Sequence, residues 1–304
     1  MLEVLKSLSA EVKRQPEILE EFWRRGFPKA PRGSIFVGAG DSFAAAQLGF
    51  FASDCRHIAL DPYVLASNPR VAEGREVYFV SVSGRTRSNT RAAKRVRPYA
   101  KQTTALTAVA DSPLAGLTDS RILLPMTYMP RTPGLLSFTL SVVAVMRISG
   151  AGGRCDYGSA LGEASAGDVA FAGGRGTTFF LGNSLAFPVS LYAAAKTYEI
   201  LGAKAHAEFL EEFNHLELFS MDRFDFVNGF SCFDPTGLAP KLSKMLNRRS
   251  LVVRGWGRSP IEKLFHAIFQ VQLSVLGEAR RRGVSAPMFL SRPDSLAASD
   301  RMIY

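Results

Sequence analysis

The sequence has no long hydrophobic run and few cysteines. No apolar stretch reaches the roughly 20 residues that cross a bilayer. The N-terminus mixes charged and apolar residues at helical spacing and lacks the apolar centre and cleavage site of a signal peptide. The three cysteines, Cys55, Cys155 and Cys232, are odd in number and far apart, which favours reduced thiols over disulfides. We therefore expect a cytoplasmic protein with no membrane partner.

Signals for metals and nucleotide cofactors are also lacking. The chain has only four histidines, and no group of His, Cys and carboxylate residues shows metal-ligand spacing. The glycines of GAGDS (38–42) do not form a dinucleotide-binding fingerprint, because Phe43 stands where the later glycine is required. We expect no metal and no cofactor.

Charge of one sign is in excess, but it is scattered. The net charge is +10, and the basic residues are scattered, with short clusters at 85–97 and 280–282. No helix-turn-helix, zinc-finger or ribonucleoprotein motif accompanies them, so nucleic acid is not an expected partner. An anionic small substrate and simple solubility both remain open as reasons for the excess.

Short apolar segments alternate with helical patterns over the first 150 residues. This alternation indicates an α/β fold with a parallel sheet covered on both faces. Pro16 falls inside the first helical window, about 2–23, and predicts a break into two helices. An apolar helix, LLSFTLSVVAVMRI, closes this part. The expected strands are SIFVG (34–38), HIALD (57–61), EVYFVSV (76–82), TTALTAVA (103–110) and RILLP (121–125).

The same pattern restarts after a Gly- and Ala-rich stretch at 151–176, which we interpret as a linker with one helix. The openings IFVGAGDS and FFLGNSLA resemble each other, which hints at a duplicated α/β domain. We predict two domains, 1–150 and 151–304. The long helix at 261–283 should end at Gly283. The expected strands of the second part are TTFFLG (177–182), DFVNGFS (225–231), SLVVRG (250–255) and PMFLS (287–291).

Hydroxyl side chains gather where the third expected strand ends. Ser81, Ser83 and Thr86 surround Gly84 just before a polar helix. Ligands of open parallel sheets bind beyond the carboxyl ends of the strands, and a helix N-terminus there offers free N–H groups to a phosphate. The same residues also suit an ordinary helix cap with a serine-rich turn, and both interpretations stand at this point. Gly40, Asp41 and Ser42 form the matching loop after the first strand.

These residues carry a resemblance to a known family. SVSGRT after an apolar strand, with VGAGDS upstream, resembles the sugar isomerase (SIS) domain. EVKRQPEIL, FFLGNSLAFPVSLYAAAKTYEI, AHAEFLEEFNH and RPDSLAASDRMIY resemble, in the same order, segments of the isomerase part of glucosamine-6-phosphate synthase. Archaeal phosphoglucose/phosphomannose isomerases are similar as well. The resemblance covers nearly the whole chain and implies two flavodoxin-like αβα SIS domains with mainly parallel sheets.

The resemblance also implies roles for individual residues. Glu199 would carry the proton between C1 and C2, and His215 would open the sugar ring. The implied chemistry is isomerisation of a hexose or aminohexose phosphate in a homodimer with its active site near the subunit interface. Phosphate contacts are implied for Ser42, Ser81, Ser83, Gly84 and Thr86, and further substrate contacts for Gly40, Asp41, Thr132, Lys196 and Glu212.

One departure from the synthase pattern keeps other functions open. The tail lysine that forms a Schiff base in the synthase is replaced here by Ala298, and alanine cannot form an imine. An amino-sugar phosphate deaminase, a synthase-like enzyme without its glutaminase, and a sugar-phosphate-binding protein without catalysis are therefore alternatives to the isomerase.

Each catalytic candidate could also have a purely structural role. Aldose–ketose isomerisation needs one base, commonly a carboxylate, and Glu199 lies in a largely apolar helix where an unpaired carboxylate is costly. Lys196, one turn earlier, would also suit an exposed ion pair worth a few tenths of a kcal/mol. His215 follows Glu211 and Glu212, which could orient its ring or simply pair with it on the surface.

Overall fold

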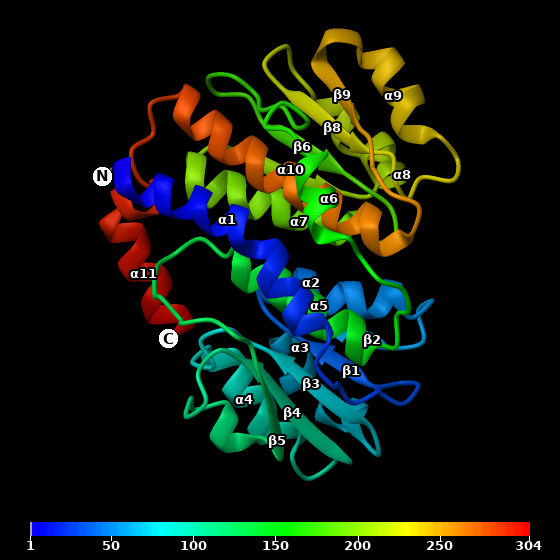
Figure 1. Ribbon diagram of the computed structural model, residues 1–304, viewed down its shortest axis with the longest axis vertical. Coiled ribbons are helices and arrows are strands. Elements are labelled where there is room, and N and C mark those ends of the chain that lie inside the picture. The colour runs from blue at the N-terminus through cyan, green and yellow to red at the C-terminus, as the bar shows by residue number, and fades with distance from the viewer. Residues whose placement is uncertain (1) are drawn as a thin grey trace. The chain divides into compact units, whose positions relative to one another are not determined.

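A computed structural model describes residues 2–304 of the chain, and these residues form two compact α/β units (Figure 1). The first-sheet unit comprises residues 18–152 and 294–304, and the second-sheet unit comprises residues 2–17 and 153–293. Each unit is built on a sheet of parallel strands, so the predicted α/β class with αβα layering is confirmed. Among residues 2–304, no helix combines the length and apolar character needed to cross a bilayer.

The first sheet has the strand order β2-β1-β3-β4-β5, and all its pairs are parallel. This is the flavodoxin-like order, in which the chain winds outward from β1 in both directions. Helices α2 and α5 pack together, as do α3 and α4. The strands are β1 (Ile35–Val37), β2 (Ile58–Leu60), β3 (Glu76–Val80), β4 (Gln102–Thr107) and β5 (Ser120–Leu123), and the helices are α2 (Asp41–Ala52), α3 (Pro62–Ser67), α4 (Arg87–Val96) and α5 (Leu136–Ile148).

Alternation along the strands divides the first core between the two faces of the sheet. Val77 and Phe79 of β3 pack in one buried cluster with residues of α3 and α4. Tyr78, between them in sequence, points to the other face and stacks on Phe36 of β1, with ring centroids 5.3 Å apart. Both faces are therefore covered, which explains why these strands read as continuous apolar runs.

The second sheet repeats the order of the first four strands as β7-β6-β8-β9, again fully parallel. The long helix α10 (Pro260–Arg281) packs on α6 and α7, and Gly283 follows it with φ +67°, which confirms the predicted glycine cap. The remaining elements are β6 (Thr178–Leu181), β7 (Ala205–Glu208), β8 (Phe226–Phe230), β9 (Ser250–Val253), α6 (Tyr157–Gly162), α7 (Ala186–Lys196), α8 (Leu210–His215) and α9 (Leu238–Leu246).

Two of the expected elements are wrong. The predicted break at Pro16 is absent, because α1 (Leu2–Trp23) runs through it as one helix. Proline inside a helix costs about 3 kcal/mol, and buried residues before and after it, Val12 and Leu19 among them, provide packing that offsets the loss. The segment PMFLS contains a 3₁₀ turn (Met288–Ser291) instead of a strand. The turn has no buried residue and is followed by α11 (Pro293–Ile303).

One strand is missing from the sequence-based expectation. β7 reads AHAE and carries no apolar run, because it lies at the edge of its sheet and three of its four residues are only half-buried. An edge strand with one paired side can keep a polar sequence, so the hydrophobic pattern gives little signal there.

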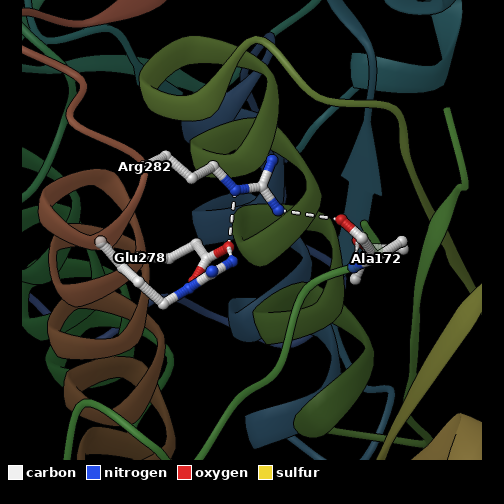
Figure 2. A network of polar contacts seen from close by, with 5 residues as sticks. Ala172, Glu278 and Arg282 are labelled. Carbon is white, nitrogen blue, oxygen red and sulfur yellow. Dashed lines mark hydrogen bonds and ion pairs between the residues drawn. The ribbon is translucent and has the colours of Figure 1, made fainter. Parts of the chain in front are cut away.

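An ion-pair network joins the end of α10 to the segment before β6. Figure 2 shows Arg282 between the Glu278 carboxylate and the carbonyl of Ala172, with Nε···Oε1 and Nη2···O distances of 2.6 and 2.8 Å. Arg281 donates from Nε to the other carboxylate oxygen of Glu278 at 2.6 Å. Burial alone would raise the pKa of Glu278, but the hydrogen bonds and charges of both arginines outweigh it and hold the pKa below its ordinary value.

We predict that Glu278→Gln lowers the free energy of unfolding by about 1–3 kcal/mol, because the half-buried Arg282 loses its charged partner. A carboxyl group with a depressed pKa stabilises the fold above its unfolded-state pKa, and this stabilisation disappears as the pH falls through the folded-state pKa. The difference from wild type in urea titrations should therefore shrink between pH 7 and about pH 3. Glu73→Gln, at an exposed position, is the control. A difference that stays constant over this range would contradict the assignment.

Candidate functional site

The loops that follow β1 and β3 meet at the point where the order of the first sheet reverses. β1 and β3 pair in parallel, with Val37 opposite Phe79. The chain leaves β1 toward β2 on one side and leaves β3 toward β4 on the other, and folds of this kind bind ligands beyond the carboxyl ends of two such strands. The sequence-predicted residues at 40–42 and 81–86 thus lie at neighbouring strand ends.

The turn after β3 is held by its own hydroxyl groups. The Gly84 N–H donates to the Ser81 carbonyl at 3.0 Å, and the Arg85 N–H donates to the Ser83 Oγ at 3.2 Å. The hydroxyls of Ser81 and Thr86 lie 3.4 Å apart. Gly84 has φ +60°, and a Cβ there would lie 2.1 Å from the Ser112 Oγ. Glycine is therefore required by the turn itself and by the packing of Ser112 against it.

Both helices that start at these strand ends lack a side-chain cap. The N-cap of α2 is Gly40, which has no side chain. The N-cap of α4 is Thr86, whose hydroxyl makes no capping hydrogen bond. Ordinary capping therefore does not explain the hydroxyl of Thr86. The first turn of α2 contains the carboxylate of Asp41, whereas that of α4 contains no acidic residue and starts with Arg87. The N-terminus of α4 is accordingly the better site for an anion.

The hydroxyl turn is covered in this structure. Ser81 and Ser83 are only 3% and 5% exposed. The tail reaches this turn, because the hydroxyl of Tyr304 interacts with Ser83 and Tyr128, although the residue is 47% exposed. Burial raises the pKa of Tyr304, and the neighbouring Tyr128 adds to this effect. Sequence reasoning missed Tyr304, although the segment RPDSLAASDRMIY had pointed to the tail.

The tail is attached through polar contacts at the surface. Arg87 of α4 donates from Nη1 to the carbonyl of Arg301 at 2.9 Å, and Arg131 forms an ion pair with Asp300 at 3.0 Å. Helix α11 has no buried residue. An element that buries so little and is held by exposed charges separates from its support at low cost.

The carboxylate of Glu199 is paired with a buried lysine. Lys196 is completely buried, its Nζ contacts Glu199 Oε2, and it lies 5.3 Å from the centre of the Tyr192 ring. The Tyr192 hydroxyl accepts from Gln272 at 3.1 Å, and Gln272 accepts from Gln15 at 3.0 Å. The sequence left open an exposed ion pair between Lys196 and Glu199. That alternative is wrong for Lys196, because its side chain is completely buried.

The backbone at Glu199 departs from the α-helix. After Lys196 the chain forms a π-helical turn (Thr197–Leu201) that ends at Gly202 with φ +61°. Single π-turns at the end of an α-helix are uncommon and occur often at functional sites. The Tyr198 hydroxyl donates to the carbonyl of Ala205, so the turn is tied to β7.

His215 lies at the surface at the end of α8. Its side chain is 68% exposed, and its Nε2 is 3.3 Å from Glu211 Oε1. Glu212 is also exposed on this helix. The structure thus gives Glu199 and His215 separate partners on separate elements of the second-sheet unit.

The remaining sequence-predicted positions lie in loops or on the surface. Ser42 is half-buried in the first turn of α2, and Thr132 is half-buried in the loop between β5 and α5. Ala298 is exposed on α11. The hydroxyl turn belongs to the first-sheet unit, whereas Glu199 and His215 belong to the other.

Comparisons with known proteins give no match to a family model and none to a curated protein. Solved structures do match. The chain superposes on glucosamine-6-phosphate deaminase from Thermotoga maritima with a TM-score of 0.67 and 18% identity, covering 91% of this chain and 95% of the other. It superposes on the tagatose-6-phosphate ketose/aldose isomerase from Escherichia coli with a TM-score of 0.65 and 16% identity, covering 93% of this chain and 90% of the other.

A third match is the C-terminal domain of glucosamine-fructose-6-phosphate aminotransferase from Francisella tularensis. Its TM-score is 0.61 and its identity 14%, and the match covers 89% of this chain and 94% of the other. At these identities the likeness concerns the fold. The chain therefore has, over nearly its whole length, the fold of these three proteins.

Proposed function

We propose that this protein is a cytoplasmic, homodimeric phosphosugar isomerase that acts on a hexose or aminohexose phosphate. The observation that carries the proposal is the hydroxyl turn at the strand-order reversal, next to the uncapped N-terminus of α4. Main-chain N–H groups, the hydroxyls of Ser81, Ser83 and Thr86, and the positive end of the helix are the groups that bind a phosphate dianion. The names of the structural neighbours, which include a ketose/aldose isomerase and a deaminase of phosphorylated sugars, support this substrate class.

The acid–base chemistry falls to Glu199 in this proposal. Isomerisation moves a proton between adjacent carbons, and a carboxylate held at the edge of an apolar region is suited to this transfer. The buried Lys196 fixes the Glu199 carboxylate in position and supplies a counter-charge. His215, held by Glu211 at the surface, would open the sugar ring.

A deaminase of amino-sugar phosphates is the second candidate, because one of the structural neighbours bears that name. The alanine at position 298 offers no amine for an imine, which disfavours the synthase-like alternative. A binding protein without catalysis would keep the hydroxyl turn but have no need of the Lys196–Glu199 pair.

Proton NMR in heavy water distinguishes these candidates. The protein is incubated separately with fructose 6-phosphate, mannose 6-phosphate and glucosamine 6-phosphate. Deuterium exchange at C1 or C2 identifies an isomerase and its substrate, and ammonia release from glucosamine 6-phosphate identifies a deaminase. Binding of these compounds with neither reaction would overturn the catalytic proposal.

Replacing Glu199 by Gln should lower kcat by at least about 10²-fold, because general-base catalysis contributes 10²–10⁴-fold. Sugar-phosphate binding, measured by calorimetry, should change little, since the phosphate contacts lie elsewhere. Glu73→Gln, an exposed carboxylate outside both loops, serves as the control. Normal turnover in the Glu199→Gln protein would show that another group transfers the proton.

Replacing Ser83 by Ala should weaken hexose 6-phosphate binding by about tenfold, the loss expected for one hydrogen bond to a charged group. Affinity for the unphosphorylated sugar should hardly change. Ser7→Ala, at an exposed position of α1, is the matched control. Equal losses for both ligands would remove the phosphate assignment.

Replacing Tyr304 by Phe should strengthen binding of inorganic phosphate by roughly two- to tenfold, because the tail hydroxyl no longer competes for Ser83. Tyr304→Ala should have an equal or larger effect, since the ring is lost as well. Titration calorimetry measures both. Weaker binding in both variants would mean that the tail forms part of the site and does not block it.

A further inference from the structure

A second group of chemically active side chains lies at the edge of the second sheet. His206 and Glu208 are two residues apart on β7, so their side chains project from the same face of this edge strand. Glu217, in the 3₁₀ turn after α8, approaches the same point. The His206 Nε2 is 3.0 Å from Glu217 Oε1 and 3.8 Å from Glu208 Oε2, and one ligand atom from each residue lies within 4.8 Å of the other two.

The surroundings orient all three side chains. Glu208 Oε1 accepts a hydrogen bond from the Phe209 N–H at 2.7 Å, which leaves Oε2 turned toward His206. The ring of His206 lies edge-on to Phe179, with centroids 6.0 Å apart. Glu217 Oε2 is buried and has no hydrogen-bond partner within residues 2–304. A buried carboxylate oxygen without a partner is costly, and a positive ion beside it would remove this cost.

The charge balance of the group also calls for a cation. Two carboxylates converge here, and in the described part of the chain neither forms an ion pair with a lysine or arginine. A bound cation would offset these two negative charges. His206 is 44% exposed, so an ion can reach the group from solvent.

The 3.0 Å contact between His206 and Glu217 is itself a hydrogen bond, and the spacing of the three ligand atoms is also compatible with a shared metal ion. Bonds of about 2.1 Å that meet at a tetrahedral angle place two ligand atoms about 3.4 Å apart. The observed separations of 3.0 and 3.8 Å bracket this value. We propose that His206, Glu208 and Glu217 bind a divalent transition-metal ion of the Zn²⁺ class, with a fourth position left to water.

The donor set selects among divalent ions. An imidazole nitrogen favours Zn²⁺, Fe²⁺ or Mn²⁺ over Mg²⁺ and Ca²⁺, which take oxygen ligands almost exclusively. Between Zn²⁺ and Mn²⁺ a site of this kind binds Zn²⁺ more tightly. Sequence analysis could not predict this site, because H-x-E followed nine residues later by Glu matches no established ligand spacing.

The proposal does not depend on the isomerase assignment, and its test measures binding only. Full-length protein without a histidine tag is titrated with Zn²⁺, Mn²⁺ and Mg²⁺ by calorimetry and by equilibrium dialysis with metal analysis. We expect one equivalent of Zn²⁺, weaker Mn²⁺ binding and no Mg²⁺ binding. Absence of stoichiometric Zn²⁺ binding up to 1 mM would overturn the proposal.

Two ligand variants and one control locate the ion. His206→Ala and Glu217→Gln should each weaken Zn²⁺ binding at least about tenfold, with far-UV circular dichroism showing that each variant is folded. His215→Ala removes a histidine from the other surface His–Glu pair of the same segment and should leave Zn²⁺ binding unchanged. If both ligand variants bind Zn²⁺ as wild type does, or if only His215→Ala loses it, the ion binds elsewhere and the proposed site is wrong.

Discussion

The parallel pairing of β1 with β3 is the constraint from which the proposed phosphate site follows. Because the chain winds away from these strands in opposite directions, their carboxyl ends carry loops that no crossover covers. The buried apolar strands keep this pairing in register, and the two helices that follow begin at the same edge without side-chain caps. In the proposed phosphate site, the N-terminus of α4 would supply oriented N–H groups beside the hydroxyl turn.

The second-sheet unit buries a charged side chain, that of Lys196. Lys196 is enclosed completely, and an isolated ammonium group in such a position would cost several kcal/mol. Glu199, the ring of Tyr192 and the polar chain through Gln272 and Gln15 compensate that cost. A purely structural helix would place an apolar residue at position 196, so the retained ion pair is an argument for chemistry at Glu199.

The sequence predicted those parts that local physics determines. Buried strands of a parallel sheet are short apolar runs, and a turn rich in hydroxyls before a helix can be recognised from residue order alone. β7 was not predicted, because this edge strand has no apolar pattern. The helix continues through Pro16 because of tertiary packing, which cannot be inferred from the local sequence. The approach of Tyr304 to Ser83 joins residues far apart in the chain, and the contact of His206 with Glu217 joins residues of two different elements. Such contacts follow from the tertiary fold and are invisible in the sequence of a single chain.

The contact between His206 and Glu217 also closes a loop, since the two residues are eleven positions apart. A flexible segment of this length loses about 2 kcal/mol of chain entropy when its ends are joined. Helix α8, with His215 at its end, lies inside that loop. Part of the chain entropy of the segment that carries α8 is thus lost during folding, before the substrate proposed for His215 binds.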